Sequence, residues 1–126
     1  YKSVGLGSIA YLRFSIFYLK GPLPVAKPLG ISNNRLNNRY ITASSIWDKY
    51  HAAWLARLHN KKRGRYIGGW SSKVNRRGQW IQYDLRRPKK IVKVATQGRQ
   101  DLNQYVTRYI FKYSADAFHW TPYRKY

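Results

Sequence analysis

The stretch Gln79-Trp80-Ile81-Gln82-Tyr83-Asp84-Leu85 decides the fold class. Apolar and polar residues alternate along it, which predicts a half-buried β-strand. In a strand, successive side chains point to opposite faces, so Ile81 and Leu85 share one face, while Trp80 and Tyr83 lie on different faces.

Further runs rich in β-forming residues flank this stretch, with Gly, Asn and basic turns between them at intervals of roughly ten residues, as in β-sandwiches. They predict strands at residues 40–44, at 91–96 after the turn Arg87-Pro88, and at 105–113, the longest. The last would face the core with Val106, with Tyr109 or Ile110, and with Phe111. From Pro28 onward the sequence therefore predicts an all-β domain.

One segment, Ile46 to Asn60, is compatible with two structures. Its large apolar residues fall three and four positions apart, which fits a helix. A long aromatic loop fits equally well. These residues are Trp47, Tyr50, Trp54 and Leu58.

Charge is the unusual feature of the composition. The 126 residues, enough for one modest domain or slightly less, hold 25 Lys and Arg against 4 acids, a net charge of +21. Such a chain is drawn to polyanions: nucleic acid, sulfated glycan or an anionic lipid surface. A solvated basic surface without a ligand explains the same excess.

The residues that are absent exclude most chemistry. The chain has no Cys and no Glu, and its three His are scattered, so no disulfide or thiolate site exists and we expect no metal site or cofactor. Its four Asp are isolated, without the carboxylate or His partner that acid–base catalysis usually needs. No nucleophile-elbow, metalloprotease or phosphate-loop motif is present. We therefore expect no enzymatic activity.

Residues 1–27 differ in composition from the rest of the chain. An apolar run from Val4 to Leu19, interrupted by Arg13, is too short and too rich in Gly for a good transmembrane helix. We assign 1–27 to a leader or foreign segment of unknown role; a signal-peptide remnant and a buried first strand are the alternatives. The lack of Met suggests a fragment or a processed form.

Seven ordered blocks between Pro28 and Trp120 resemble the discoidin, or coagulation factor 5/8 type C, domain family. Each block is weak alone, and the match rests on their order and spacing over residues 28–126. The blocks are Pro28-Leu29-Gly30, Tyr40-Ile41-Thr42-Ala43-Ser44-Ser45, Ala56-Arg57-Leu58, Gly69-Trp70-Ser71, Gln79 to Leu85, Val94-Ala95-Thr96-Gln97-Gly98-Arg99, and Tyr113-Ser114-Ala115-Asp116 closed by Trp120.

This resemblance implies an extracellular, secreted or cell-surface jelly-roll β-sandwich of the galactose-binding-domain-like type, without catalytic activity. Relatives bind anionic phospholipid, glycans, collagen or protein receptors through loops that project from one end of the sandwich. Carried over by position, the first loop is Ile46 to Trp54, the second Trp70 to Arg77 and the third Arg99 to Gln104.

The chain also departs from the family pattern. Relatives usually carry a Cys ahead of the Pro-Leu-Gly block and another at the end of the domain, whereas Ala26 and Lys27 stand here. The closing strands expected after Trp120 are missing, so the domain at 28–126 is expected to be incomplete, with exposed strand edges.

The candidate ligand-binding residues come from the three loops, where aromatic and apolar side chains alternate with cations, as suits a membrane interface. They are Trp47, Lys49, Tyr50, His51, Trp54, Lys73, Val74, Arg76, Arg77, Arg99 and Leu102. For each loop a structural role is the alternative: aromatic rings packed on the core, an ordinary basic turn, and an Arg99–Asp pair that holds the third loop. We assign Trp70, Trp80 and Trp120 to the core or its rim, and Asp116 to a hairpin turn.

These features favour a non-catalytic adhesion or recognition module whose partner is an anionic membrane, an acidic or sulfated glycan, collagen or a cell-surface receptor. Polyanion binding by net charge alone, nucleic acid included, is a second hypothesis, although no nucleic-acid motif supports it. A non-functional fragment is the third, and a carbohydrate-binding accessory to an enzyme the fourth.

Overall fold

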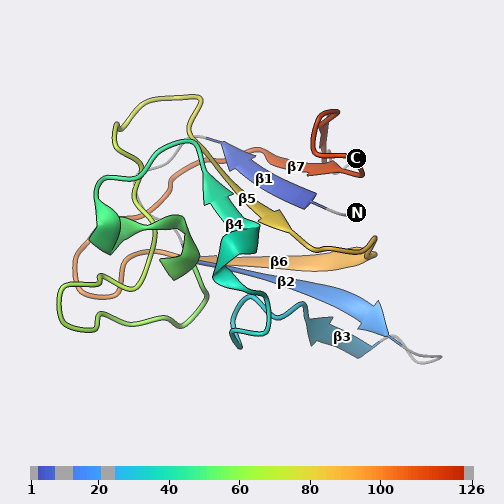
Figure 1. The fold of residues 1–126 in the computed structure, drawn as a ribbon, viewed down its shortest axis with the longest axis horizontal. Coiled ribbons are helices and arrows are strands. Elements are labelled where there is room, and N and C mark those ends of the chain that lie inside the picture. Colours follow the sequence, from blue (N-terminus) through green and yellow to red (C-terminus); the bar gives the residue numbers. More distant parts are fainter. Residues whose placement is uncertain (1–2, 8–12, 21–24, 124–126) are drawn as a thin grey trace.

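Two antiparallel sheets form the protein in a computed structural model, which describes residues 3–7, 13–20 and 25–123 (Figure 1). The five-stranded sheet has the order β4-β5-β1-β7-β8 and the three-stranded sheet the order β3-β2-β6. The bounds are β1 Ser3–Gly7, β2 Arg13–Lys20, β3 Val25–Pro28, β4 Ile41–Ala43, β5 Trp80–Asp84, β6 Ile91–Gln97, β7 Phe111–Ser114 and β8 Thr121–Pro122, with short 3₁₀ turns η1 Asn38–Tyr40, η2 Lys49–His51 and η3 Ala53–Leu55. The all-β prediction is confirmed.

The first two strands belong to the segment that the sequence analysis set apart as a leader. β1 lies inside the larger sheet, paired with β5 from Ser3–Asp84 to Gly7–Trp80 and with β7 on its other side. β2 is the neighbour of β6 in the smaller sheet. The described residues of this segment thus pair with strands of the predicted domain, and periodicity alone does not distinguish a short apolar strand from a leader.

The core follows the alternation in β5. Ile81 and Tyr83 are fully buried and Leu85 nearly so, as the pattern predicts. Trp80, assigned to the core or its rim, is 42% exposed and therefore lies outside the core, because its side chain takes the opposite face of the strand. Trp70 is confirmed as a core residue, because it is fully buried and its indole N–H donates to the Ser45 carbonyl at 2.8 Å.

A buried cation lies beside this core. Arg57 is 4% exposed, and its guanidinium donates to the carbonyls of Ile31 and Leu36 and to the side chain of Asn38, each at 2.7 Å. Burial lowers the pKa of Arg57, and burial also raises the pKa of the fully buried Tyr83 well above its ordinary value. Arg57 therefore stabilises the fold by satisfying oxygens that water does not reach.

The expected strand at 105–113 is wrong in its extent. Only Phe111 onward pairs with other strands, as β7, while residues 105–110 run as irregular chain with Tyr109 and Ile110 exposed. β-propensity depends on a neighbouring strand, and residues 105–110 have no ladder partner among the described strands.

The segment from Ile46 to Asn60 is a loop with two single 3₁₀ turns, not a continuous helix. Within the described residues no helix is long and apolar enough to cross a membrane.

Two turns show tight local geometry. Gly68 has a positive φ of +70°, and a Cβ there would meet the backbone of Lys61 at 2.5 Å, so only glycine fits. In the β7–β8 connection, Asp116 accepts from the backbone N–H groups of Phe118 and His119, both at 2.8 Å. The prediction that Asp116 is a hairpin-turn residue is confirmed.

Candidate functional site

The three predicted loops gather at one end of the sandwich. In Figure 1 the long connection from β4 to β5 and the connection from β6 to β7 lie together at the left, opposite the β7–β8 turn. We call this region the loop end: residues 44–79 and 98–110. The first connection follows directly on β4, and the second follows directly on β6.

The first loop presents Trp47 on a braced backbone. Trp47 is 63% exposed, while its backbone N–H donates to the Ser71 carbonyl at 2.9 Å. Asp48 caps η2 by accepting from the Tyr50 N–H at 2.8 Å, and it lies 2.6 Å from Nδ1 of His51. This contact with His51 lowers the pKa of Asp48. The loop therefore holds an exposed indole without needing a ligand to order it.

A cluster of aromatic rings and cations covers the flank of the first loop. Tyr66 contacts Tyr50 edge-on at 5.4 Å between ring centroids and Trp54 at 5.6 Å. Lys49 and Arg65 lie over the Tyr50 ring at 5.1 and 6.0 Å. Tyr50 is thus half-buried against other rings, whereas Trp54 is only partly covered. Sequence reasoning missed Tyr66, because it lies outside all three carried-over loops.

The second loop carries cations around one apolar side chain. Lys73, Arg76 and Arg77 are exposed, and Val74 is 39% exposed. The base of the loop is tied to the first, since the Ser45 hydroxyl accepts from the Lys73 N–H at 3.0 Å. Apolar and cationic groups therefore face solvent together here.

The third loop is held by the ion pair that the sequence analysis named as the alternative for Arg99. Its Nε lies 2.6 Å from the Asp101 carboxylate, and its guanidinium also donates to Gln104 at 2.9 Å. The hydrogen bond from Arg99 lowers the pKa of Asp101, which Lys62 also approaches at 3.8 Å. Leu102, at the turn of this loop, is 54% exposed.

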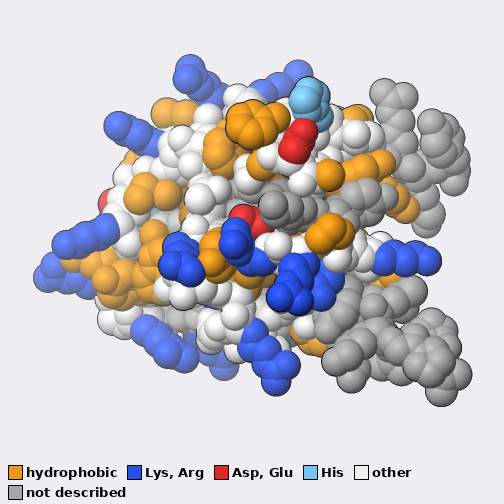
Figure 2. Space-filling model, turned by 45° about the vertical axis from the view of Figure 1, so that its right-hand side comes forward, with side chains coloured by type: hydrophobic (Ala, Val, Ile, Leu, Met, Phe, Trp, Pro, Cys, Tyr) orange, Lys and Arg blue, Asp and Glu red, His pale blue; other side chains and the backbone are white. Residues whose placement is uncertain are grey.

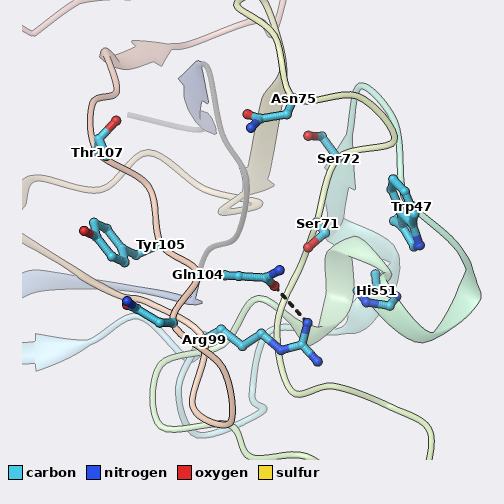
Figure 3. A pocket seen from close by; sticks show the side chains of 10 residues that line it. Trp47, His51, Ser71, Ser72, Asn75, Arg99, Gln104, Tyr105 and Thr107 are labelled. Carbon is cyan, nitrogen blue, oxygen red and sulfur yellow. Dashed lines mark hydrogen bonds between the residues drawn. The ribbon is translucent and has the colours of Figure 1, made fainter.

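A polar cleft of about 670 Å³ lies between the three loops (Figure 3). In Figure 3, Arg99 and Gln104 extend from the third loop toward Ser71 and His51, while Tyr105 points away. Hydroxyl, amide and guanidinium groups converge there, as in sites that orient a polar ligand. The lining residues are Trp47, His51, Ser71, Ser72, Asn75, Arg99, Asn103, Gln104, Tyr105 and Thr107.

The structure thus brings three of the predicted site residues, Trp47, His51 and Arg99, around one cleft. The remaining eight do not line this cleft and lie on the loops around it. Sequence reasoning missed its amide and hydroxyl groups, such as Asn75 and Gln104. Their residue types carry no sequence signal, because polar loop residues are common in every protein.

Positive charge is spread widely over the surface. Figure 2 shows Lys and Arg side chains scattered across the visible face, with few acidic groups between them. Each of the four Asp already has a basic neighbour: Asp48 has His51, Asp84 has Arg86, Asp101 has Arg99 and Asp116 has His119. Most of the cations therefore lack a carboxylate partner within the described part of the chain.

No group of three metal-ligating side chains occurs among residues 3–7, 13–20 and 25–123. The His–Asp contacts at His51 and His119 are local (i, i+3) pairs that fix turns.

Comparison with known proteins agrees with this architecture. The family model for the F5/8 type C domain matches residues 40–126. Coagulation factor V from Bos taurus is 38% identical over 104 residues, covering 78% of this chain and 5% of that protein. Lactadherin from Sus scrofa is 36% identical over 107 residues, covering 79% of this chain and 25% of that protein.

The chain therefore spans only a small part of these relatives' length. No solved structure matches it significantly. The resemblance inferred from the ordered blocks and the jelly-roll prediction are both confirmed. This chain belongs to the F5/8 type C (discoidin) domain family.

Proposed function

We propose that the loop end binds the surface of an anionic phospholipid membrane, in an extracellular setting. One observation carries the proposal: each of the three loops presents an exposed apolar side chain, Trp47, Val74 and Leu102. Three such groups at one end of a rigid sandwich can enter a lipid interface together. Apolar side chains that are exposed beside cations at one end of a domain are suited to a membrane interface.

The cations near the exposed apolar side chains favour an anionic lipid as the partner. Lys49 follows Trp47 by two positions, and Lys73 and Arg76 flank Val74. Juxtamembrane cations contribute roughly 1 kcal/mol each at an anionic leaflet. Trp is favoured at headgroup depth, where its ring is in apolar surroundings and its N–H remains hydrated.

The polar cleft between the loops supports the proposal further. Its donors, Arg99, Asn75 and Gln104 among them, face the space that a headgroup would enter as the apolar side chains insert. Because Asp101 pairs with Arg99, the cleft has hydrogen-bonding capacity without a large excess of charge. A zwitterionic headgroup with a net negative charge, such as phosphoserine, suits this balance.

The test is binding to vesicles with and without phosphatidylserine. Burial of about 100 Å² of the exposed Trp47 ring is worth about 2.5 kcal/mol, so Trp47→Ala should weaken binding by several tens of fold. Phe118→Ala is the matched control, since Phe118 is 87% exposed but lies in the β7–β8 turn at the opposite end. Equal losses in the two variants, or no binding by the intact chain, would exclude the loop end as the membrane site.

A further inference from the structure

A second, basic groove lies beside the polar cleft. It has a volume of about 740 Å³, and it forms where the end of the second loop meets the chain that leads into β7. Thr107 lines both the groove and the polar cleft, so the two adjoin. The groove residues are Arg77, Gly78, Thr107, Arg108, Tyr109, Ile110 and Lys112.

Three cations line this groove, and no acid does. Arg77, Arg108 and Lys112 are exposed, and each of the chain's four Asp pairs elsewhere. The fold thus places like charges around one hollow, which costs free energy through their mutual repulsion. An anionic ligand would remove that cost, and guanidinium groups are suited to planar, bidentate contact with sulfate or phosphate oxygens.

The groove also offers an apolar wall. Tyr109 and Ile110 are exposed within it, although residues with this β-propensity would ordinarily be buried in a strand. Ligand sites commonly combine an aromatic or aliphatic wall with a few polar groups that fix orientation. An aromatic face flanked by cations suits a sugar ring that carries anionic substituents.

The position of the groove favours a linear polymer over a membrane. Lys112 belongs to β7 and lies opposite Gly5 of β1 and Pro122 of β8, so it sits on the body of the sheet and not on a loop tip. A flat bilayer that receives Trp47, Val74 and Leu102 meets the loop tips first. A flexible chain can instead follow the flank from Arg77 to Lys112.

We propose that this groove binds a sulfated glycan chain, with Arg77, Arg108 and Lys112 contacting sulfate groups and Tyr109 packing on a sugar ring. The groove adjoins the proposed membrane site and shares Arg77 with its second loop, but it contains none of the three exposed apolar side chains Trp47, Val74 and Leu102. A protein that uses both would be able to bind a lipid surface and a sulfated polysaccharide at the same time.

The experiment measures binding of a heparin oligosaccharide of defined length by titration calorimetry at several salt concentrations. The test variant is Arg108→Gln/Lys112→Gln, which leaves the three predicted loops intact. The control is Arg35→Gln/Lys90→Gln, which removes the same charge from exposed positions that do not line the groove. Unsulfated heparosan, phosphatidylserine vesicles and a single-stranded oligonucleotide are the comparison ligands.

We expect the groove variant to weaken heparin binding at least about tenfold and to reduce the salt dependence by about two released ions. The control variant should change affinity less than about twofold, and vesicle binding should persist in both variants. Equal losses in groove and control variants would show attraction by net charge alone and overturn the proposal. The proposal would also be overturned if the intact chain did not bind heparin, or if it bound heparosan equally well. A groove variant that lost only vesicle binding or only oligonucleotide binding would overturn it too.

Discussion

Replacing the buried cation, Arg57→Met, should destabilise the protein severely. The substitution leaves the buried carbonyl oxygens of Ile31 and Leu36 without their donors. Each unsatisfied buried group costs about 1–3 kcal/mol. Part of this cost is offset, because Met is apolar and the desolvation of a buried charge disappears. A net loss of about 2–4 kcal/mol is therefore expected, a large fraction of the stability of a small domain.

The assay is equilibrium unfolding in urea followed by Trp fluorescence. With a slope of about 2 kcal/mol per molar urea, the midpoint of Arg57→Met should fall by about 1–2 M. The urea midpoint of Arg57→Lys should lie between those of the unchanged protein and of Arg57→Met, because one ammonium group cannot donate to as many oxygens as the forked guanidinium does. Arg63→Met, at an exposed position, is the control and should shift the midpoint little. A midpoint for Arg57→Met equal to that of the control would refute the role of these hydrogen bonds.

Three further predictions concern single sites or segments. Gly68→Ala should cost more than about 2 kcal/mol in urea unfolding, whereas Gly64→Ala, with positive φ but open space around its Cβ, should cost about 1 kcal/mol; equal costs would exclude the steric clash. Asp116→Asn should return the raised pKa of His119 toward its ordinary 6.5 in an NMR titration, because the hydrogen bond from His119 to the Asp116 carboxylate raises it. The stabilisation that protonated His119 provides is present below pH 6.5 and is lost as the pH rises through its raised pKa. The stabilisation that ionised Asp116 provides is lost as the pH falls through the lowered pKa of Asp116. An unchanged His119 titration in the variant would contradict the pairing. Deleting residues 1–27 should lower the urea midpoint, because β1 pairs on both sides within its sheet and β2 is paired with β6; a deletion with unchanged stability would support a separate leader.

Prediction of the core face and of the family succeeded where apolar and polar residues alternate or where motifs follow one another in a fixed order. The alternation around Ile81 correctly assigned the core face of β5, and the same period places Trp80 outside the core. The blocks from Pro28 to Trp120 led to the family. The Arg99–Asp101 pair was also predictable, because two opposite charges two positions apart in a turn meet easily.

Where contacts depend on chain segments far apart, prediction failed. Tyr66 joins the cluster of Tyr50 and Trp54 only because the loop folds back, and no local pattern signals that return. Residues 105–110 have the composition of a strand, but a strand forms only where a partner is available. Whether residues 1–27 belong to the domain is likewise a matter of pairing across the whole chain.

Insertion of Trp47 into an anionic bilayer can be measured by the fluorescence quenching that lipids brominated along their acyl chains cause. The intact chain is compared with Trp47→Phe, in which the other four Trp report the background. We expect stronger quenching of the intact chain than of the variant on vesicles that contain phosphatidylserine, and no difference between them on phosphatidylcholine alone. Equal quenching of both proteins on the anionic vesicles would contradict insertion of Trp47.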